Sequence, residues 1–460
     1  MTDGRQIKLE VGVNLYYNCS YGIPDHHNGK GLHKMKIAFY TLGCKVNQYE
    51  TQAMAETMEK QGFELVTPDE SADIYVINSC TVTAESNRKT RQAVRRFKRS
   101  HPDSIVILTG CMPQAFPEDA RRLEQADIVL GNRSNARLPE LIERYFSCGE
   151  RIVEIREHEN KERFEGDSVS GFEGRTRCFV KIEDGCNRFC SYCIIPYSRG
   201  RVRSKPIDEL RQELERLSSK GFSEVVLVGI NLSAYGRDIG LNICDAAELA
   251  AELDFSRVRL GSIEPDHLTD DIIERLAAIE KLCPQFHISL QSGCDRTLRA
   301  MNRHYTADEF RRLCKKLRSE FEGATLTTDI MVGFPSETEE DFRESVEFAK
   351  EIGFEKVHVF PYSAREGTRA AKMPQLTRAV KTERSRIMIE ETEKIRRAFL
   401  LSNVGKRVEV LPETRRADGF TEGYTRNYTP VMVRGSHESG KPIEVTVTGV
   451  EGDFCVAEAD

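Results

Sequence analysis

The sequence predicts an α/β protein built from three successive folded parts. From residue 36 to about residue 360, short apolar runs alternate with amphipathic stretches, which is typical of parallel strands covered by helices. After residue 404 apolar side chains recur at every second position, as in strands with one buried face. A chain of 460 residues is expected to hold two to four domains. We therefore predict an N-terminal parallel α/β sheet domain, a partial (βα)6 barrel and a small C-terminal antiparallel β-barrel.

The first predicted domain covers residues 35–149, with strands at 37–40, 74–77, 105–108 and 128–130. Residues 1–34 show no sustained periodicity and are expected to be a flexible extension. Residues 150–174 are charged and contain several glycines, which indicates a linker.

The second predicted domain covers residues 175–400, and its expected strands lie at 179–182, 225–228, 258–260, 287–290, 326–331 and 357–360. Six strand and helix units fit a partial TIM-like barrel, in which the chemistry lies at the carboxyl ends of the strands. Pro206 and a capping box from Ser336 to Glu339 predict two helix starts, and a charged helix over 376–400 closes the domain. Residues 401–460 form the last barrel, which is comparable in size to OB-like nucleic-acid modules.

The composition is that of an ordinary globular protein and excludes several classes. Hydrophobic residues make up 39% and charged residues 30%, which excludes collagen-like and fully disordered chains. No apolar run approaches the roughly 18 residues that a bilayer span needs, and the chain begins without a secretory signal pattern. We therefore expect a cytoplasmic protein with no membrane partner. The net charge of −6 excludes a general basic coat, so a polyanion would have to meet a local basic patch.

Cys186, Cys190 and Cys193, which we call the barrel triad, form the strongest chemical signal. The chain has 14 cysteines, a number that needs an explanation other than disulfides in a reducing compartment. Three thiolates at this spacing can bind three corners of a 4Fe-4S cluster, which leaves one iron open for a small molecule. The alternatives are buried structural cysteines or a zinc site, but a structural zinc needs four ligands and no matching pair follows.

Cys44, Cys80 and Cys111, which we call the sheet triad, are dispersed in the sequence. Each follows a different predicted strand of the first domain by a few residues. Because the carboxyl ends of neighbouring parallel strands share one crevice, the three thiolates could meet there. Chance placement of buried cysteines is the alternative. The two triads together suggest two clusters, each with one iron that has no protein ligand.

These motifs resemble a known enzyme family. The barrel triad on the first strand loop of a six-unit barrel resembles the radical S-adenosylmethionine (radical SAM) enzymes. The domain order and four segments resemble the methylthiotransferases among them, most closely the MtaB type: Thr41–Glu50, Asn78–Thr83, Thr109–Cys111 and Cys193–Pro196. The segment Gly423–Tyr428 resembles the TRAM RNA-binding module, and the whole resemblance spans residue 35 to the end.

The resemblance implies a tRNA methylthiotransferase that inserts a methylthio group at C2 of N6-threonylcarbamoyladenosine at tRNA position 37. The implied cofactors are two 4Fe-4S clusters and S-adenosyl-L-methionine (SAM). The cluster on the barrel triad would bind SAM and yield a 5′-deoxyadenosyl radical, and the cluster on the sheet triad would hold or supply the sulfur. The implied partners are the tRNA anticodon stem-loop, an electron donor such as flavodoxin or ferredoxin, and a sulfur donor.

Further cofactor contacts are expected near the ends of the barrel strands. The family places a side chain just before the last cysteine near adenine, which implies a role for Tyr192. Loops at the carboxyl ends of barrel strands face the cavity. Their candidates for cofactor binding are Gly229, Asn231, Ser262, Glu264, Ser289 and Gln291. Each of these could instead be a cap or turn residue.

Basic residues form three candidate RNA contacts. The predicted helix between Ser86 and Ser100 has seven Lys and Arg residues and no acid, which favours RNA contact over a solvated face. The arginines on one face of this helix are Arg88, Arg91, Arg95 and Arg99. Near the barrel triad, phosphates could meet Arg199, Arg201, Arg203 and Lys205. In the last domain, the cations and stacking faces are Arg415, Arg416, Arg426, Arg434, Tyr424 and Tyr428.

Three other functions compete with this prediction. Related enzymes with the same domain plan modify isopentenyladenosine in tRNA or an aspartate of a ribosomal protein, and the Cys44–Asn47 tract disfavours both. An iron-sulfur RNA-binding regulator is a non-enzymatic alternative. Such a regulator would bind tRNA without releasing 5′-deoxyadenosine from SAM.

Overall fold

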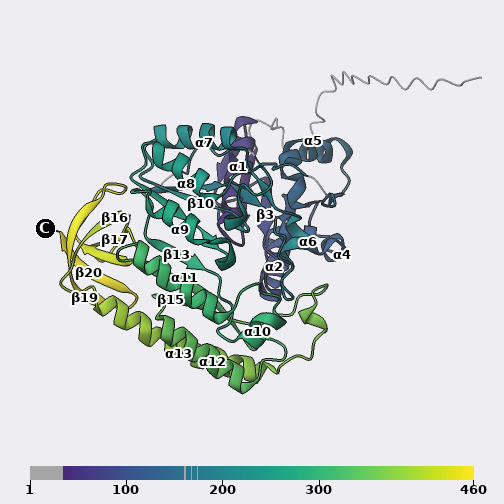
Figure 1. Cartoon of the computed structure of the whole chain (residues 1–460). Coiled ribbons are helices and arrows are strands. Elements are labelled where there is room, and N and C mark those ends of the chain that lie inside the picture. Colours follow the sequence, from purple (N-terminus) through teal and green to yellow (C-terminus); the bar gives the residue numbers. More distant parts are fainter. Residues whose placement is uncertain (1–34, 160–161, 167, 173–174, 460) are drawn as a thin grey trace, which may run out of the picture.

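The computed structural model describes residues 35–159, 162–166, 168–172 and 175–459, so the predicted extension over residues 1–34 lies outside it. Figure 1 shows a sheet with its helices in purple and blue, a larger barrel in teal and green, and a small barrel in yellow. The α/β fold class predicted from the sequence is confirmed. None of the described helices is long and apolar enough to cross a bilayer.

The first part is a fully parallel six-stranded sheet with the order β2-β1-β3-β4-β5-β6. Its strands are β1 (Lys36–Thr41), β2 (Glu64–Val66), β3 (Ile74–Ser79), β4 (Ile105–Gly110), β5 (Ile128–Leu130) and β6 (Ile152–Glu154). Its helices are α1 (Lys45–Lys60), α2 (Ala84–Ser100), α3 (Cys111–Ala115), α4 (Pro117–Arg121) and α5 (Leu138–Cys148). Strands β3 and β4 are buried throughout, because their continuous apolar runs face helices on both sides.

The sequence pattern does not predict the two edge strands. Strand β2 has three residues and is largely exposed, so it carries no buried apolar face. Strand β6 lies inside the predicted linker and pairs in parallel with β5, so the linker begins only after Glu154. Part of this linker is held in place, since the Glu56 carboxylate on α1 accepts backbone hydrogen bonds from Ser170 (2.8 Å) and Gly171 (3.1 Å).

The second part is a partial barrel made of two parallel sheets that continue each other. The first sheet holds β7 (Arg177–Lys181), β10 (Glu224–Val228) and β11 (Arg257–Leu260). The second holds β12 (Ser262–Ile263), β13 (Gln285–Ile288), β14 (Thr325–Val332) and β15 (Lys356–Pro361). Gly261 separates β11 from β12, and its N–H still donates to the carbonyl of Leu227 on β10 (2.9 Å). A short antiparallel pair follows β7, namely β8 (Glu183–Asp184) and β9 (Arg203–Ser204).

Helices cover the outside of this barrel. They are α7 (Ile207–Ser219), α8 (Ile243–Glu252), α9 (Asp270–Ala277), α10 (Asp295–Ala300), α11 (Ala307–Glu320) and α12 (Glu339–Ile352). Pro206 precedes α7 as predicted, but the predicted capping box from Ser336 to Glu339 is wrong. Ser336 has a left-handed φ of 73°, and the capping box that forms joins Thr338 to Asp341. Both pairs have the same spacing, so the spacing alone does not select between them.

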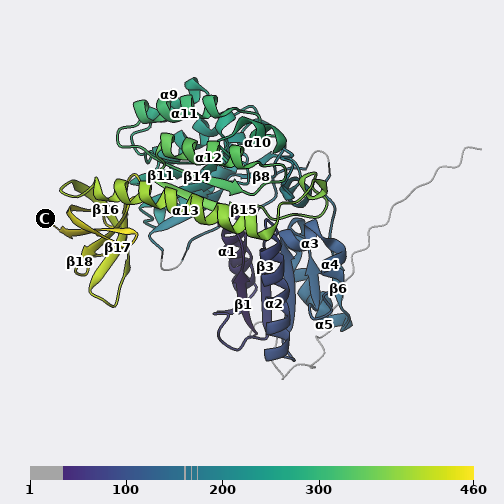
Figure 2. The same cartoon turned by 90° about the horizontal axis from the view of Figure 1, so that it is seen from below.

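The C-terminal part begins with α13 (Arg378–Leu401), which runs from the large barrel to the small one (Figure 2). The small barrel is closed, with the order β16-β17-β18-β20-β19. Its strands are β16 (Arg407–Arg415), β17 (Phe420–Thr425), β18 (Pro430–Arg434), β19 (Ile443–Glu451) and β20 (Phe454–Ala459). The pairing of β18 with β20 is parallel and the other pairings are antiparallel.

Helix α1 holds the first sheet against the barrel. Its residues Val46, Tyr49 and Ala53 share one apolar core with Phe179 of β7. The Tyr49 hydroxyl also donates to the Glu213 carboxylate on α7 (2.7 Å). Figure 2 shows the sheet domain below the barrel, with α3 at the junction. Helix α6 (Ile195–Arg199) of the barrel packs against α3. The carboxyl ends of β1, β3 and β4 therefore meet the loops that follow β7.

Candidate active site with two cysteine triads

The barrel triad lies in the loop after β7 and β8, at the carboxyl end of the barrel strands. Cys186 N donates to the carbonyl of Gly200 (3.0 Å) and Cys193 N donates to the carbonyl of Cys190 (3.0 Å), so the loop folds back on itself. Phe189, between the first two cysteines, has a left-handed φ of 50°. Such backbone is costly for an aromatic residue and clusters at functional sites.

Two polar side chains contact sulfurs of the barrel triad. Asn231 Nδ2 lies 3.9 Å from Cys186 Sγ, and Arg303 Nη1 lies 3.4 Å from Cys190 Sγ. Burial raises the pKa of the Cys193 thiol to about 12 and the pKa of the Cys186 thiol above its ordinary value. Burial therefore favours the protonated form of these two thiols, and iron must displace their protons when they become ligands.

Two predicted cofactor residues, Glu264 and Ser289, meet at Arg303. Glu264 Oε1 accepts from Arg303 Nη1 (3.2 Å), and the Ser289 carbonyl accepts from Arg303 Nη2 (2.9 Å). Because Arg303 contacts Cys190, Glu264 and Ser289 lie one side chain away from the barrel triad. Their contacts orient the guanidinium toward the sulfur.

Gly229 and Asn231 position Glu183, which sequence reasoning missed. Asn231 N donates to Glu183 Oε2 (2.7 Å), and a Cβ on residue 229 would lie 2.7 Å from that same oxygen. Glu183 is fully buried, and its Oε1 has no hydrogen-bond partner among the described residues. Burial raises the pKa of Glu183 well above its usual range. The sequence does contain a signal for Glu183, because an acidic residue directly follows the apolar barrel strand.

The other predicted cofactor residues are Tyr192, Ser262 and Gln291. The Tyr192 ring packs edge to face against Phe334, with ring centroids 6.5 Å apart. Ser262 is exposed and lines a cavity inside the barrel. Gln291 has a left-handed φ of 67°, and its backbone N–H donates to the carbonyl of Asp329 (2.8 Å). All three lie at or near the carboxyl ends of the strands, where the sequence places them.

The structure brings Cys44, Cys80 and Cys111 together at the carboxyl ends of β1, β3 and β4 in the first sheet. Cys44 is the N-cap of α1, Cys80 follows β3, and Cys111 begins α3. A Cβ built on Gly43 would lie 3.1 Å from the Cβ of Cys80, so the first two loops touch. Burial raises the pKa of Cys111 to about 12, although the nearby Arg199 guanidinium opposes that rise. Cys80 and Cys44 are close enough to raise the pKa of Cys111 further.

Two asparagines fix the loops of the sheet triad. Cys44 Sγ lies 3.3 Å from Asn47 Oδ1, and Asn78 Nδ2 donates to the carbonyl of Asn47 (3.0 Å). Gly110, just before Cys111, has φ 95°, and a Cβ there would lie 2.5 Å from Asn78 Oδ1. A glycine therefore precedes Cys111 because no side chain fits between the loops.

Arg199 joins the two triads. It ends α6, which begins two residues after Cys193, and its Nε lies 3.1 Å from Cys111 Sγ. A five-residue helix spans roughly 7–8 Å, so one short helix separates the triads. Arg199 is 1% exposed, and its guanidinium also binds Glu50 of α1 (2.9 Å) and Asp184 of β8 (3.4 Å).

Lys181 completes a buried group of charges that we call the bridge network: Glu50, Lys181, Asp184 and Arg199. Lys181 Nζ donates to Glu50 Oε1 (2.8 Å) and Asp184 Oδ2 (2.7 Å). Burial acts to raise the pKa of both carboxyls, but the two cations outweigh it and hold both pKa values below the usual range. Two cations matched with two carboxylates can remain charged inside the protein.

The expected phosphate contacts near the barrel triad are wrong for three residues: Arg199, Arg203 and Lys205. Arg203 is 8% exposed and donates to the carbonyls of Arg199 (2.9 Å) and Arg201 (3.0 Å). Lys205 is fully buried and binds the Glu213 carboxylate. The Glu50 partner of Arg199 is distant in the sequence, whereas Arg203 and Lys205 find acceptors nearby in the chain that depend on how the loop and α7 fold. Arg201 stays exposed.

Helix α2 carries several cations that have no acidic partner among the described residues. Arg88 forms an ion pair with Glu85 just outside the acid-free stretch. The side chains of Arg91, Arg95 and Arg99 have no ion pair or hydrogen bond within the part of the chain that is described. Helix α2 of the first domain thus keeps three guanidinium groups that have no partner among the described residues.

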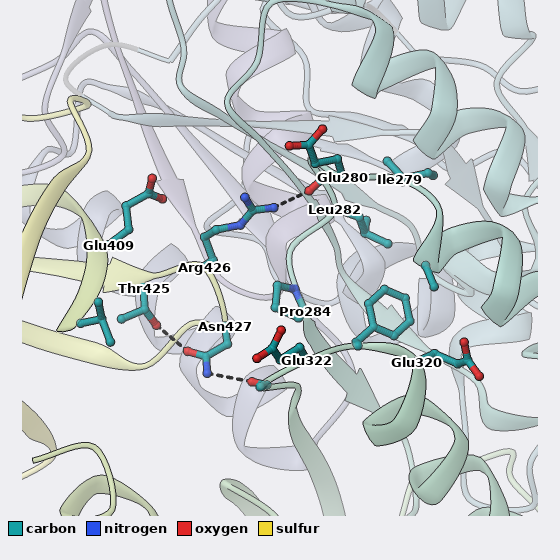
Figure 3. A pocket seen from close by; sticks show the side chains of 14 residues that line it. Ile279, Glu280, Leu282, Pro284, Glu320, Glu322, Glu409, Thr425, Arg426 and Asn427 are labelled. Carbon is teal, nitrogen blue, oxygen red and sulfur yellow. Dashed lines mark hydrogen bonds between the residues drawn. The ribbon is translucent and has the colours of Figure 1, made fainter. Parts of the chain in front are cut away.

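The C-terminal barrel uses two predicted RNA residues at its junction with the large barrel. Arg426 donates to the carbonyl of Glu280 and faces a cavity of about 440 Å³ (Figure 3). Tyr428 stacks on Tyr424 with ring centroids 4.4 Å apart, and the Arg259 guanidinium lies 4.5 Å over the Tyr428 ring. Arg426 and Tyr428 therefore contact the large barrel, and their contact with RNA stays a prediction.

The remaining candidate RNA contacts of this barrel differ in whether they pair with an acidic side chain. Arg416 binds Asp418 (2.9 Å) and Glu422, so neighbouring acids neutralise it. Arg434 lies 3.6 Å from Glu458. Arg415 is exposed, with no ion pair among the residues of the described barrel.

Comparisons with known proteins identify the family of this chain. Residues 36–131 match the model of the family described as "Uncharacterized protein family UPF0004", and residues 180–349 match the radical SAM superfamily. The chain is 39% identical to threonylcarbamoyladenosine tRNA methylthiotransferase MtaB of Aquifex aeolicus, over 90% of this chain and 100% of that protein. The chain belongs to the radical SAM methylthiotransferase family.

Other methylthiotransferases are similar to nearly the same degree. Identity is 37% to MtaB of Bacillus subtilis, over 89% of this chain and 93% of the relative. It is 36% to tRNA-2-methylthio-N(6)-dimethylallyladenosine synthase of Pelotomaculum thermopropionicum, over 90% and 95%. The solved radical SAM methyltransferase TsrM of Kitasatospora setae shares the fold, with a TM-score of 0.52 and 14% identity over 74% of this chain and 77% of TsrM.

The residues of this radical SAM methylthiotransferase fit the 4Fe-4S cluster and SAM of its superfamily. The barrel triad offers three sulfurs and leaves the fourth corner of a cluster without a ligand. Glu183 Oε1 is buried and has no hydrogen-bond partner among the described residues, so the site holds a polar atom that a ligand could bind. Within the described ranges no three His, Cys, Asp or Glu side chains converge on a single metal ion. A cuboidal 4Fe-4S cluster does not need its ligands to converge on one point, because each cysteine binds a different iron atom.

Proposed function

We propose that this enzyme inserts a methylthio group at C2 of N6-threonylcarbamoyladenosine at position 37 of tRNA. The observation that carries the proposal is the contact of Arg199 with Cys111, since it places the sheet triad one short helix from the barrel triad. One adenine can then meet both triads. The similarity to MtaB proteins supports threonylcarbamoyladenosine over dimethylallyladenosine as the substrate.

In this proposal the sheet triad binds a second 4Fe-4S cluster, so the cofactors are two clusters and SAM. When bound, the barrel-triad cluster and SAM supply a 5′-deoxyadenosyl radical for hydrogen abstraction. Arg303 and Asn231 orient the sulfurs of the barrel triad, and Arg199 places positive charge against the sheet triad. Glu183 offers a buried carboxyl group whose Oε1 has no hydrogen-bond partner among the described residues.

The reaction also needs electrons and sulfur, so the proposal includes an electron donor such as flavodoxin or ferredoxin and a separate sulfur donor. It places the enzyme in the cytoplasm, where tRNA is modified. Phe189 and Tyr197 are candidates to stack on bases of the anticodon loop. Their rings pack edge to face at 5.9 Å, yet 40% of Phe189 and 53% of Tyr197 stay exposed beside the barrel triad.

The proposed function is tested by mass spectrometry of tRNA nucleosides from a strain that lacks the gene. We expect 2-methylthio-N6-threonylcarbamoyladenosine to disappear and N6-threonylcarbamoyladenosine to accumulate. Persistence of the methylthio mark would overturn the assignment, and loss of methylthiolated isopentenyladenosine or of a modified ribosomal aspartate would select an alternative substrate. A protein that binds tRNA but releases no 5′-deoxyadenosine from SAM under reduction would be a regulator.

Replacing Gly43 with alanine is expected to reduce iron binding by the sheet triad. The new Cβ would clash with Asn47 Oδ1 at a φ of 129°, and Asn47 fixes Cys44. We expect about four irons per chain after anaerobic reconstitution in place of about eight. Gly149→Ala is the matched control, because Gly149 also has a positive φ (65°) but lies far from any clash. A full complement of iron in Gly43→Ala would contradict this role.

Replacing Arg91, Arg95 and Arg99 with glutamine is expected to weaken tRNA binding, with a larger effect at low salt. If all three meet phosphates, the slope of log Kd against log salt concentration should fall by about two to three. Fluorescence anisotropy with labelled tRNA measures both quantities. The matched control replaces three exposed arginines of α12 and α13, namely Arg343, Arg386 and Arg397. Equal salt slopes in wild type and the α2 variant would exclude this face.

A further inference from the structure

A cavity of about 640 Å³ lies inside the partial barrel, within the size range of sites for small ligands. Its wall joins the lumen face of β13, β14 and β15 to the first residue of α1 and to the C-terminal barrel. The lumen face is polar because β14 alternates. Thr325, Thr327 and Asp329 line the cavity, whereas Leu326 and Ile330 lie in the apolar core behind it.

The carboxylates of this wall already have partners. Asp329 faces His287 at 3.4 Å. Asp453 binds Arg396 (3.0 Å), and Glu355 binds Arg318 (3.2 Å). The lining cation Arg259 is likewise matched, by Glu224 (2.8 Å).

Two lining amines are not matched. The side chains of Lys45 and Lys356 have no ion pair or hydrogen bond within the described residues. Lys356 stands at the start of β15, away from the carboxyl ends of the strands. Lys45 directly follows Cys44, and its Nζ lies 5.9 Å from the centre of the Phe179 ring. Its side chain is exposed and lines this cavity.

We propose that Lys45 binds the carboxylate of the substrate's threonyl group and thereby selects an acidic N6 substituent. This inference rests on the proposed function, because it takes the reacting base to be N6-threonylcarbamoyladenosine. The threonyl group and the reacting C2 belong to the same modified base. A side chain adjacent to Cys44 is therefore within reach of the N6 substituent when C2 faces the sheet triad.

The chemistry of the two substrate classes differs at this point. A threonylcarbamoyl group ends in a carboxylate, which gains a charge-assisted hydrogen bond from an ammonium. A dimethylallyl group is apolar, so it would leave the Lys45 ammonium without a partner in the cavity. Lys45 would thus favour the acidic base and disfavour the apolar one.

The test compares two anticodon stem-loop RNAs, one with N6-threonylcarbamoyladenosine and one with its methyl ester, which removes the negative charge. Reconstituted wild type is expected to prefer the acid by about tenfold or more in kcat/KM. Lys45→Gln should lose about ten- to a hundredfold on the acid and little on the ester, so that the preference falls to about one. Lys45→Arg should keep most of the preference, and Lys356→Gln, the matched control, should keep all of it.

The outcomes separate the inference from the proposed function. If wild type converts the acid RNA and Lys45→Gln keeps the wild-type preference, Lys45 does not read the carboxylate. Equal losses on acid and ester, together with lost iron, would assign Lys45 a structural role at Cys44 and overturn the inference. If wild type fails on the acid RNA but converts RNA with dimethylallyladenosine, the proposed function itself fails and the inference falls with it.

Discussion

Replacing all three cysteines of the sheet triad with alanine is expected to abolish methylthio transfer while SAM cleavage continues. The barrel triad has its own loop, and its contacts with Asn231 and Arg303 do not involve the first sheet. We expect about four irons per chain and continued release of 5′-deoxyadenosine under reduction. Chromatography of 5′-deoxyadenosine and mass spectrometry of tRNA nucleosides measure the two activities separately.

The converse variant, with alanine at the three cysteines of the barrel triad, is the control. It should retain the other half of the iron and lose both activities, because SAM cleavage requires the barrel cluster. Thermal unfolding of both metal-free variants should match that of metal-free wild type. A folded sheet-triad variant that binds four irons but cannot cleave SAM would show that the triads do not act separately.

Replacing Arg199 with methionine is expected to destabilise the metal-free protein by about 3–5 kcal/mol. The substitution removes one cation from the bridge network and leaves Glu50 with Lys181, and Asp184 with Lys181 and Arg203 (3.4 Å). Chemical denaturation, followed by the shift of the unfolding midpoint, measures the effect. Because folding lowers the pKa of Glu50, the stabilisation is present above the ordinary carboxyl pKa of about 4.3. The difference between wild type and variant should shrink as the pH falls below that value.

Two further variants test the cause of this effect. Arg386→Met breaks an ion pair on α13 whose side chains are 59% and 57% exposed, so we expect a change of about 0.5 kcal/mol or less. Adding Glu50→Gln to Arg199→Met removes the carboxylate that has lost one of its two cations and should restore part of the lost stability. An Arg199→Met midpoint equal to that of wild type would contradict the importance of the bridge network.

Local sequence patterns predict the main strands and the three folded parts. Continuous apolar runs such as Ile105–Leu108 are buried on both faces of a parallel sheet, and their period leaves little choice of structure. Strands β2 and β6 escape such reasoning because short edge strands bury few side chains. The capping box fails for another reason, since two overlapping pairs of residues satisfy the same spacing and tertiary contacts select Thr338.

The two cysteine triads follow from sequence because their placement depends on topology alone. Loops at the same edge of a parallel sheet must converge, so Cys44, Cys80 and Cys111 meet without any detailed knowledge of side chains. The partners of Arg203 and Arg426 could not be predicted in this way. Arg203 reaches backbone carbonyls across a tight loop, and Arg426 reaches the carbonyl of Glu280 from another domain. A basic residue reveals its charge in the sequence, but its acceptor depends on the fold.

The bridge network limits how freely the first sheet could be exchanged between enzymes. Glu50 comes from α1, whereas Lys181, Asp184 and Arg199 come from the barrel side. A chimaera that grafts this sheet onto a foreign barrel would bury a lone carboxylate unless the recipient supplied matching cations. In such hybrids the sheet and the barrel should not pack stably against each other, even when each part folds well. Transplanting Glu50 together with its three partners is the smallest exchange that keeps the graft electrically balanced.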